Sequence, residues 1–282
     1  MGNAVKTVLL LGVLTGLLLA IGDALGGRQG LILALGIAGL MNFVGYFFSD
    51  KIALAMHHAQ PVDEREAPEL YAVVAELSQR AGIPMPRLYV IPELQPNAFA
   101  TGRSPKHAAV AVTEGLLRTM NRAELAGVLA HELAHVKNRD ILTASIAATL
   151  AGAITVLARM VGYALMFGGR DREDNGGAFG GIFLLIVAPI NALLIQLAIS
   201  RSREYAADEK AARLTGNPMG LASALRKLAA LTERVPMETA QPATASLMIA
   251  NPLSGGGLMR LFSTHPPIEE RIARLEAMVG RL

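Results

Sequence analysis

Four long apolar stretches constrain this 282-residue chain more than any other feature of its sequence. They cover Val5 to Gly22, Leu31 to Phe48, Ile141 to Phe167 and Phe179 to Ser200. Each is close to the roughly 20 residues that a helix needs to cross a hydrocarbon layer. Short connections separate the first from the second and the third from the fourth, so the pattern predicts four transmembrane helices in two hairpins.

The first stretch has a second interpretation, because Lys6 followed by an apolar run also opens secretory signal peptides. No small-residue cleavage signal leads from it into a polar segment, however, and the second apolar stretch follows almost at once. The sequence therefore favours a retained membrane anchor.

The basic residues predict the orientation of these helices. The polar segment between the second and third stretches carries ten Lys and Arg residues, and the segment after the fourth carries eleven. The hairpin connections carry only Arg28 in one and Arg170 and Arg172 in the other, offset by acidic residues. Because cytoplasmic segments are enriched in Lys and Arg, both polar segments and both termini are expected in the cytoplasm.

The chain is thus expected to divide into four parts. These are a transmembrane hairpin at 1–49, a cytoplasmic subdomain at 50–140, a second hairpin at 141–200 and a cytoplasmic helical subdomain at 201–282. Apolar periodicity and turn residues predict helices at 64–81, 114–120, 122–139, 203–214, 218–231 and 267–278, and short strands at 87–91, 98–101 and 108–113. The predicted fold class is an α+β membrane protein, mostly helical with a small sheet, and residues 236–263 form a candidate flexible lid.

Charge and cysteine content exclude some functions. The net charge of +3 comes without a basic stripe that alternates with aromatic residues, so we expect it to face anionic lipid and not nucleic acid. With no cysteine, the chain has neither disulfides nor a thiolate metal site.

A metal-binding pattern lies just before the third apolar stretch. His131 and His135 flank Glu132 inside a strongly helical segment, and a spacing of four places both imidazoles on one helix face. Two such histidines can bind one Zn²⁺ while the intervening glutamate acts on a bound water. The alternative is a pair of hydrogen-bonded core histidines.

A third ligand is expected from the other polar segment. The third and fourth stretches would carry the chain away from the membrane surface and back, which returns Glu204 to the level of the histidines. Asp208 shares a helix face with Glu204, so Glu204 can bind the metal while Asp208 accepts the outer N–H of a ligand histidine. On spacing alone, both could instead be ordinary surface charges.

These segments resemble the HtpX family of bacterial membrane proteases over essentially the whole chain. The resemblance rests on the His-Glu-x-x-His helix followed by Asn138 and Asp140, on the segment 200–208, on residues 96–100 and on Thr264-His265-Pro266. It implies a zincin-like, zinc-dependent and ATP-independent endopeptidase, with one Zn²⁺ per chain and no nucleotide. Its expected location is the bacterial inner membrane, where it degrades damaged or misfolded membrane proteins.

The resemblance also implies roles for single residues. It assigns zinc to His131, His135 and Glu204 and catalysis to Glu132, with Asn138 in a supporting role. It places Asn97, Ala98 and Phe99 along the substrate cleft, where an extended peptide can pair with a sheet edge, although Asn97 could equally be a polar turn residue after Pro96. His265 is expected near the oxyanion, although it could equally cap the helix that follows.

Two other functions remain open from the sequence. A CAAX-type prenyl-peptide protease shares the zinc core, but four membrane helices are few for the larger chamber of such enzymes. A membrane scaffold or chaperone could bind zinc without hydrolysing peptide bonds, and an assay of proteolysis separates the two classes.

Overall fold

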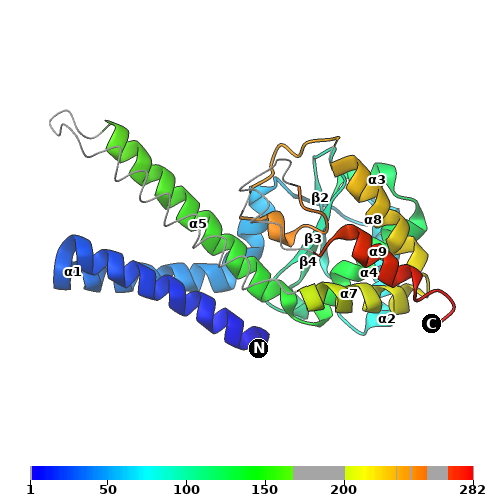
Figure 1. Ribbon diagram of the computed structural model, residues 1–282, viewed down its shortest axis with the longest axis horizontal. Coiled ribbons are helices and arrows are strands. Elements are labelled where there is room, and N and C mark those ends of the chain that lie inside the picture. The colour runs from blue at the N-terminus through cyan, green and yellow to red at the C-terminus, as the bar shows by residue number, and fades with distance from the viewer. Residues whose placement is uncertain (1, 168–200, 233, 242, 253–265, 282) are drawn as a thin grey trace.

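The computed structural model describes residues 2–167, 201–232, 234–241, 243–252 and 266–281, and Figure 1 shows their arrangement. Helix α1 (Asn3–Met56) is a hairpin of two helices, with a break at Gly27, whose φ is 53°. The two arms touch near the turn, where a Cβ on Gly30 would lie 1.9 Å from the carbonyl oxygen of Gly22. Only glycine allows this close approach.

Two segments of α1, Asn3–Ala20 and Gly26–Met56, are long and apolar enough to cross a membrane. Helix α5 (Asp140–Phe167) runs beside the hairpin, and Leu10 and Leu14 of α1 pack against Ile146 of α5. The apolar part of α5 with described side chains is the shorter segment Asp140–Thr155. The predicted fourth span at 179–200 lies outside the described residues, so the structure supports two spans of the four predicted.

The polar segments contain a small mixed sheet of four strands. The strands are β1 (Gln60–Pro61), β2 (Arg87–Ile91), β3 (Ala98–Thr101) and β4 (Ala109–Thr113). Their order is β1-β2-β4-β3, with β2 parallel to β4 and the other pairs antiparallel. Strand β3 is therefore an edge strand, with no further strand of the sheet on its outer side among the described residues.

Helices cover this sheet. They are α2 (Pro68–Ala81), α3 (Glu114–Thr119), α4 (Arg122–Lys137), α7 (Arg201–Thr215), α8 (Pro218–Thr232) and α9 (Ile268–Glu276), with 3₁₀ turns at Pro105–His107 and Ala245–Leu247. The three longer strands and six helices agree with the sequence-based expectation to within a few residues. Helix α2 starts later than predicted, at Pro68, because proline suits the first turn of a helix.

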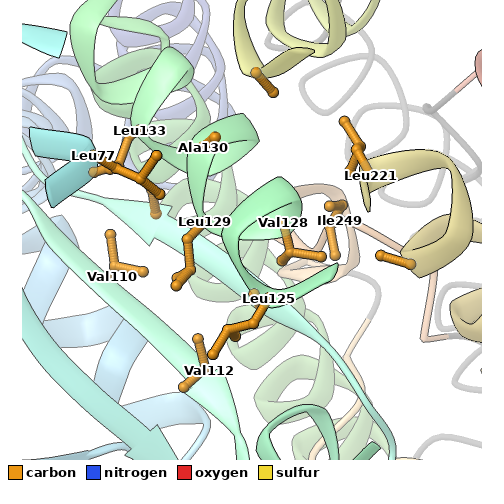
Figure 2. Close-up of a cluster of buried hydrophobic side chains, with 14 of the residues drawn as sticks. Leu77, Val110, Val112, Leu125, Val128, Leu129, Ala130, Leu133, Leu221 and Ile249 are labelled. Atoms are coloured by element: carbon orange, nitrogen blue, oxygen red, sulfur yellow. The ribbon is translucent and has the colours of Figure 1, made fainter. Parts of the chain in front are cut away.

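Helix α4 is the centre of the main hydrophobic core. Figure 2 shows Leu129 and Val128 of α4 between Val110 of β4 and Leu221 of α8, all fully buried. The helix is apolar on several faces, as expected for one enclosed by neighbours. The core joins residues of both polar segments, so 50–140 and 201–282 form one packed unit around α4.

Candidate metal centre

Helix α4 carries both predicted histidines, and side-chain hydrogen bonds fix the start of this helix. Asn121 and Glu124 form a capping box, in which the Asn121 side chain accepts from the Glu124 N–H and the Glu124 carboxylate accepts from the Asn121 N–H. Two turns later, the Nε2 atoms of His131 and His135 lie 3.2 Å apart. The helix therefore aims both imidazoles at one point.

Glu204 comes to the same point from α7. Its carboxylate oxygens lie 3.6 Å from Nε2 of His131 and 3.5 Å from Nε2 of His135. Ligand atoms about 2.0–2.1 Å from a tetrahedral zinc ion are separated by about 3.3 Å. The separation of the two nitrogens and their distances to the two Glu204 oxygens are all close to this value, so the three residues could hold one metal ion.

Hydrogen bonds outside this group fix which nitrogen of each histidine faces the metal position. Nδ1 of His131 donates to Asp208 at 2.9 Å, and Nδ1 of His135 donates to Asp140 at 3.1 Å. With both protons on Nδ1, both Nε2 atoms keep a lone pair for a metal. Asp208 thus accepts the outer N–H of a histidine, as the sequence predicted. Asp140 accepts the corresponding N–H of the second histidine.

Arg271 of α9 completes this outer layer. It is fully buried, and its Nε and Nη2 donate to the two carboxylate oxygens of Asp208 at 2.9 and 2.7 Å. Sequence analysis missed this residue. A signal exists, because Arg271 lies three residues after Ile268 and four before Leu275, which places an arginine on the apolar face of an amphipathic helix.

The charges of the buried groups depend on one another. Burial lowers the pKa of His131, but hydrogen bonds to Asp208 and Glu204 outweigh this effect and raise the pKa to about 9. Burial also opposes ionisation of Asp208, yet the adjacent Arg271 lowers its pKa to about 2. Asp208 is therefore a permanent anion that favours a proton on Nδ1 of His131.

Glu132 points into the same buried space. Burial raises the pKa of its carboxyl group, although the neighbouring histidines act to lower it. The backbone N–H of Ala100 in β3 donates to the same carboxyl group and also acts to lower its pKa. A carboxylate with a raised pKa beside a metal position is suited to accept and return a proton. A cavity of about 40 Å³ lies here, lined by Glu132, the three ligand residues and Leu247, among others.

One described part of the predicted lid lies against the edge of the sheet. The N–H of Ile249 donates to the carbonyl of Ala98 in β3 at 3.0 Å. The buried side chain of Asn97 bonds both backbone groups of Ala250, donating to the carbonyl at 2.8 Å and accepting from the N–H at 3.3 Å. Residues 247–250 therefore occupy the position along β3 where an added strand would pair.

The remaining predicted site residues lie elsewhere. The side chain of Phe99 is buried in a cluster on the other face of the strand, with its ring centroid 5.5 Å from that of His57. Asn138 ends α4, and its side-chain oxygen accepts from Lys210 of α7. His265 lies outside the described residues.

This arrangement of a histidine pair, a returning glutamate and apolar hairpin helices is that of a metallopeptidase attached to a membrane. The pattern of Peptidase family M48 matches residues 64–279, so the chain belongs to that family. It is a membrane-bound metallopeptidase, as its full-length relatives also indicate.

Two relatives named Protease HtpX homolog match along their whole length. The protein from Syntrophobacter fumaroxidans is 57% identical over 282 residues, covering 99% of this chain and 100% of its own. The protein from Sulfurihydrogenibium sp. is 55% identical over 290 residues, covering 100% of this chain and 98% of its own. The crystal structure of Ste24p from S. mikatae has a similar fold, with a TM-score of 0.52 at 19% identity, and the match covers 97% of this chain and 65% of that one.

Proposed function

We propose that this chain is a zinc-dependent, ATP-independent endopeptidase of the bacterial inner membrane that cleaves misfolded or damaged membrane proteins on the cytoplasmic side. The observation that carries the proposal is the convergence of His131, His135 and Glu204. The two Nε2 atoms lie 3.2 Å apart, and each lies 3.5–3.6 Å from one of the two Glu204 carboxylate oxygens, which suits one tetrahedral ion. When bound there, Zn²⁺ would acidify a water molecule and polarise the peptide carbonyl.

The side chains around this position divide the remaining work. Glu132 accepts the proton of the attacking water and returns it to the leaving amine, a role that its raised pKa favours. Asp208 and Asp140 hold the histidine rings in the metal-binding tautomer. Arg271 keeps Asp208 ionised and fixed in position.

The substrate would bind in extended form along the outer edge of β3. The Ala98 carbonyl and the Asn97 amide, which now bond to Ile249 and Ala250, would bond to the substrate backbone instead. A cavity of about 40 Å³ holds little more than a water molecule, so residues 247–250 must move aside before a peptide enters.

Mutation of Glu132 tests the catalytic assignment. Protein purified in detergent and loaded with zinc should cleave an unfolded model protein without ATP and lose this activity with a chelator. Glu132→Gln should keep about one zinc per chain and lose at least ~100-fold in turnover. Glu114→Gln, which removes an exposed carboxylate on α3, is the matched control and should retain activity.

Three other outcomes would argue for different functions. Normal turnover by Glu132→Gln would remove this residue from the mechanism. Zinc binding without any cleavage would favour a scaffold or chaperone. Cleavage restricted to prenylated peptides would favour a CAAX-type enzyme.

A further inference from the structure

A second hollow lies at the end of the α1 hairpin, apart from the metal centre. It has a volume of about 520 Å³ and is formed by the last turns of α1, the start of β2 and the turn between β3 and β4. One wall is aromatic and the other is basic. Its principal lining residues are Phe43, Phe47, Lys51, Arg87, Arg103 and Lys106.

The aromatic wall belongs to the second candidate membrane span. Phe43, Phe47 and Phe48 are 54%, 42% and 38% exposed, although they are large apolar side chains. From Gly26, where the span begins, to Phe48 the helix rises about 33 Å, close to the thickness of a hydrocarbon core. With the hairpin turn at one face of the hydrocarbon core, Phe48 lies near the opposite face and Lys51 lies just beyond it.

The basic wall stands at this same level. Arg87 is paired with Asp50 at 2.6 Å, and Asp50 is the only carboxylate among the described residues that line the hollow. Among the described residues, no carboxylate lies within ion-pair distance of Lys51, Arg103 or Lys106. The hollow thus carries an excess of positive charge next to an apolar surface.

Local contacts hold two of these cations at the border between the walls. The Arg103 guanidinium lies 5.4 Å from the ring centroid of Phe47, and Nζ of Lys51 lies 5.4 Å from that of Phe48. Nη2 of Arg103 also donates to Nε2 of His107 at 2.9 Å, and His107 is bonded in turn to Ser104. Arg103 is therefore positioned by two neighbours, Phe47 and His107, before any ligand arrives.

We propose that this hollow is a binding site for an anionic glycerophospholipid of the surrounding bilayer. The phosphate would bind Arg103, Lys106 and Lys51, while an acyl chain would lie along Phe43 and Phe47. A free anion would leave the aromatic wall exposed, and a zwitterionic lipid would leave the net positive charge of the hollow uncompensated. The lipid class follows from charge complementarity together with the depth of the hollow at the membrane surface.

Lipid binding to the full-length protein tests this proposal without reference to proteolysis. Detergent-purified protein would be titrated with phosphatidylglycerol and, separately, with phosphatidylcholine, and binding followed by native mass spectrometry. Removing one cation should lower the affinity for phosphatidylglycerol about fivefold. The double variant Arg103→Gln with Lys106→Gln should therefore lower it by roughly tenfold or more. The affinity for phosphatidylcholine should change little.

A matched pair of substitutions separates a specific site from general attraction. Arg118→Gln with Arg122→Gln removes two exposed cations from α3 and α4, outside the hollow, and should change the affinity less than twofold. Equal losses for both pairs, or no loss for the first pair, would overturn the proposal. Thermal unfolding of each variant verifies that its fold is intact.

The aromatic wall is tested in the same assay. Phe47→Ser should weaken the binding of phosphatidylglycerol, because an acyl chain loses its apolar contact surface. If inorganic phosphate at millimolar concentration displaces phosphatidylglycerol completely, or if Phe47→Ser binds it normally, the hollow is a simple anion site and the lipid proposal fails.

Discussion

Each of the two histidines that we propose as zinc ligands is oriented by its own carboxylate, and one of those carboxylates is paired with a buried arginine. Asp208 bonds Nδ1 of His131, and Arg271 bonds both oxygens of Asp208. Arg271 touches no position where substrate would react, so it is a positioning residue. Groups in such an outer layer commonly change metal affinity by about 10–100-fold when they are removed.

We expect Arg271→Met to weaken zinc binding by about 10–100-fold, because Asp208 loses the partner that fixes it beside His131. Competition with a chelator of known affinity measures this at a temperature where the protein stays folded. Arg271→Lys, which keeps the charge, should restore part of the affinity. Arg274→Met is the control, since Arg274 is exposed and lies 3.7 Å over the ring of Tyr205. Unchanged affinity in Arg271→Met would exclude the positioning role.

Zinc binding should depend strongly on pH. In the metal-free protein the pKa of His131 is raised to about 9 from its usual value of 6.5, so the ring carries an extra proton at neutral pH that zinc must displace. Apparent zinc affinity should therefore rise from pH 6 to about pH 9, as measured by chelator competition. Asp208→Asn removes the hydrogen bond that contributes most to raising this pKa and should flatten the dependence.

The same shift has the opposite effect on the metal-free fold. Because the folded-state pKa of His131 lies above the unfolded value, protonation stabilises the fold fully below about pH 6.5. This stabilisation is lost as the pH rises through about 9. The midpoint of thermal unfolding of chelator-treated protein should fall over this range, and a constant midpoint would contradict the assigned shift.

Much of the candidate site could be predicted from sequence at the residue scale. The spacing of four between His131 and His135 fixes their common face, and the returning hairpin nominates Glu204. Arg271 was missed because its partner Asp208 is 63 residues away in sequence, and only the packing of α9 on α7 brings them together. A charged residue on the apolar face of a helix thus indicates a buried partner of opposite charge, as Asp208 is for Arg271.

At the scale of elements, the boundaries of helices and strands followed from local signals. The exception is the segment 236–263, whose small and polar residues indicated a flexible loop. Within it, Leu247, Met248 and Ile249 are buried, because Asn97 and the edge of β3 bond to the backbone around them. No local pattern reveals such pairing, since the partner strand lies about 150 residues earlier in the chain.

The close packing of α4 on α8 depends on glycine. A Cβ at Gly127 would lie 2.6 Å from the backbone nitrogen of Leu221, and backbone cannot yield as a flexible side chain does. We expect Gly127→Ala to destabilise the protein by ~1–3 kcal/mol and to displace the helix that carries the ligand histidines. Thermal unfolding and zinc content would report both effects.

A second helical glycine provides the control. A Cβ at Gly36 in α1 would meet no atom within 4 Å, so Gly36→Ala should leave the unfolding midpoint unchanged or slightly higher. Equal behaviour of the two variants would show that α4 and α8 have room to separate.

At the scale of the whole molecule, the sequence predicted the class of architecture more securely than its membrane topology. The two arms of α1 are candidate spans, while α5 is described as apolar only over Asp140–Thr155. The described residues of the two polar segments, 50–140 and 201–282, share one core. In the sequence, only the predicted hairpin that returns the chain to the same side of the membrane indicated this. Hydropathy reports which segments avoid water, whereas packing partners depend on tertiary contacts.

The start of α1 is bonded directly to the surroundings of the metal centre. The Asn3 side chain donates to Asp140 at 2.8 Å, and Arg203 donates to Asn3 at 2.7 Å and to Asp140 at 3.2 Å. Asp140 in turn orients His135. Asn3→Ala should therefore bind zinc a few-fold more weakly, while Asn42→Ala, which removes a bond to Thr15 within the hairpin, should not.

Removing the leading hairpin to obtain a water-soluble enzyme would thus remove the membrane anchor. It would also remove the Asn3 side chain, which bonds to Asp140 beside the proposed metal site. Such a shortened protein should purify with less than one zinc per chain and regain activity only in excess metal. We therefore expect the site to reach its full affinity for zinc only in a chain that retains the start of its first helix.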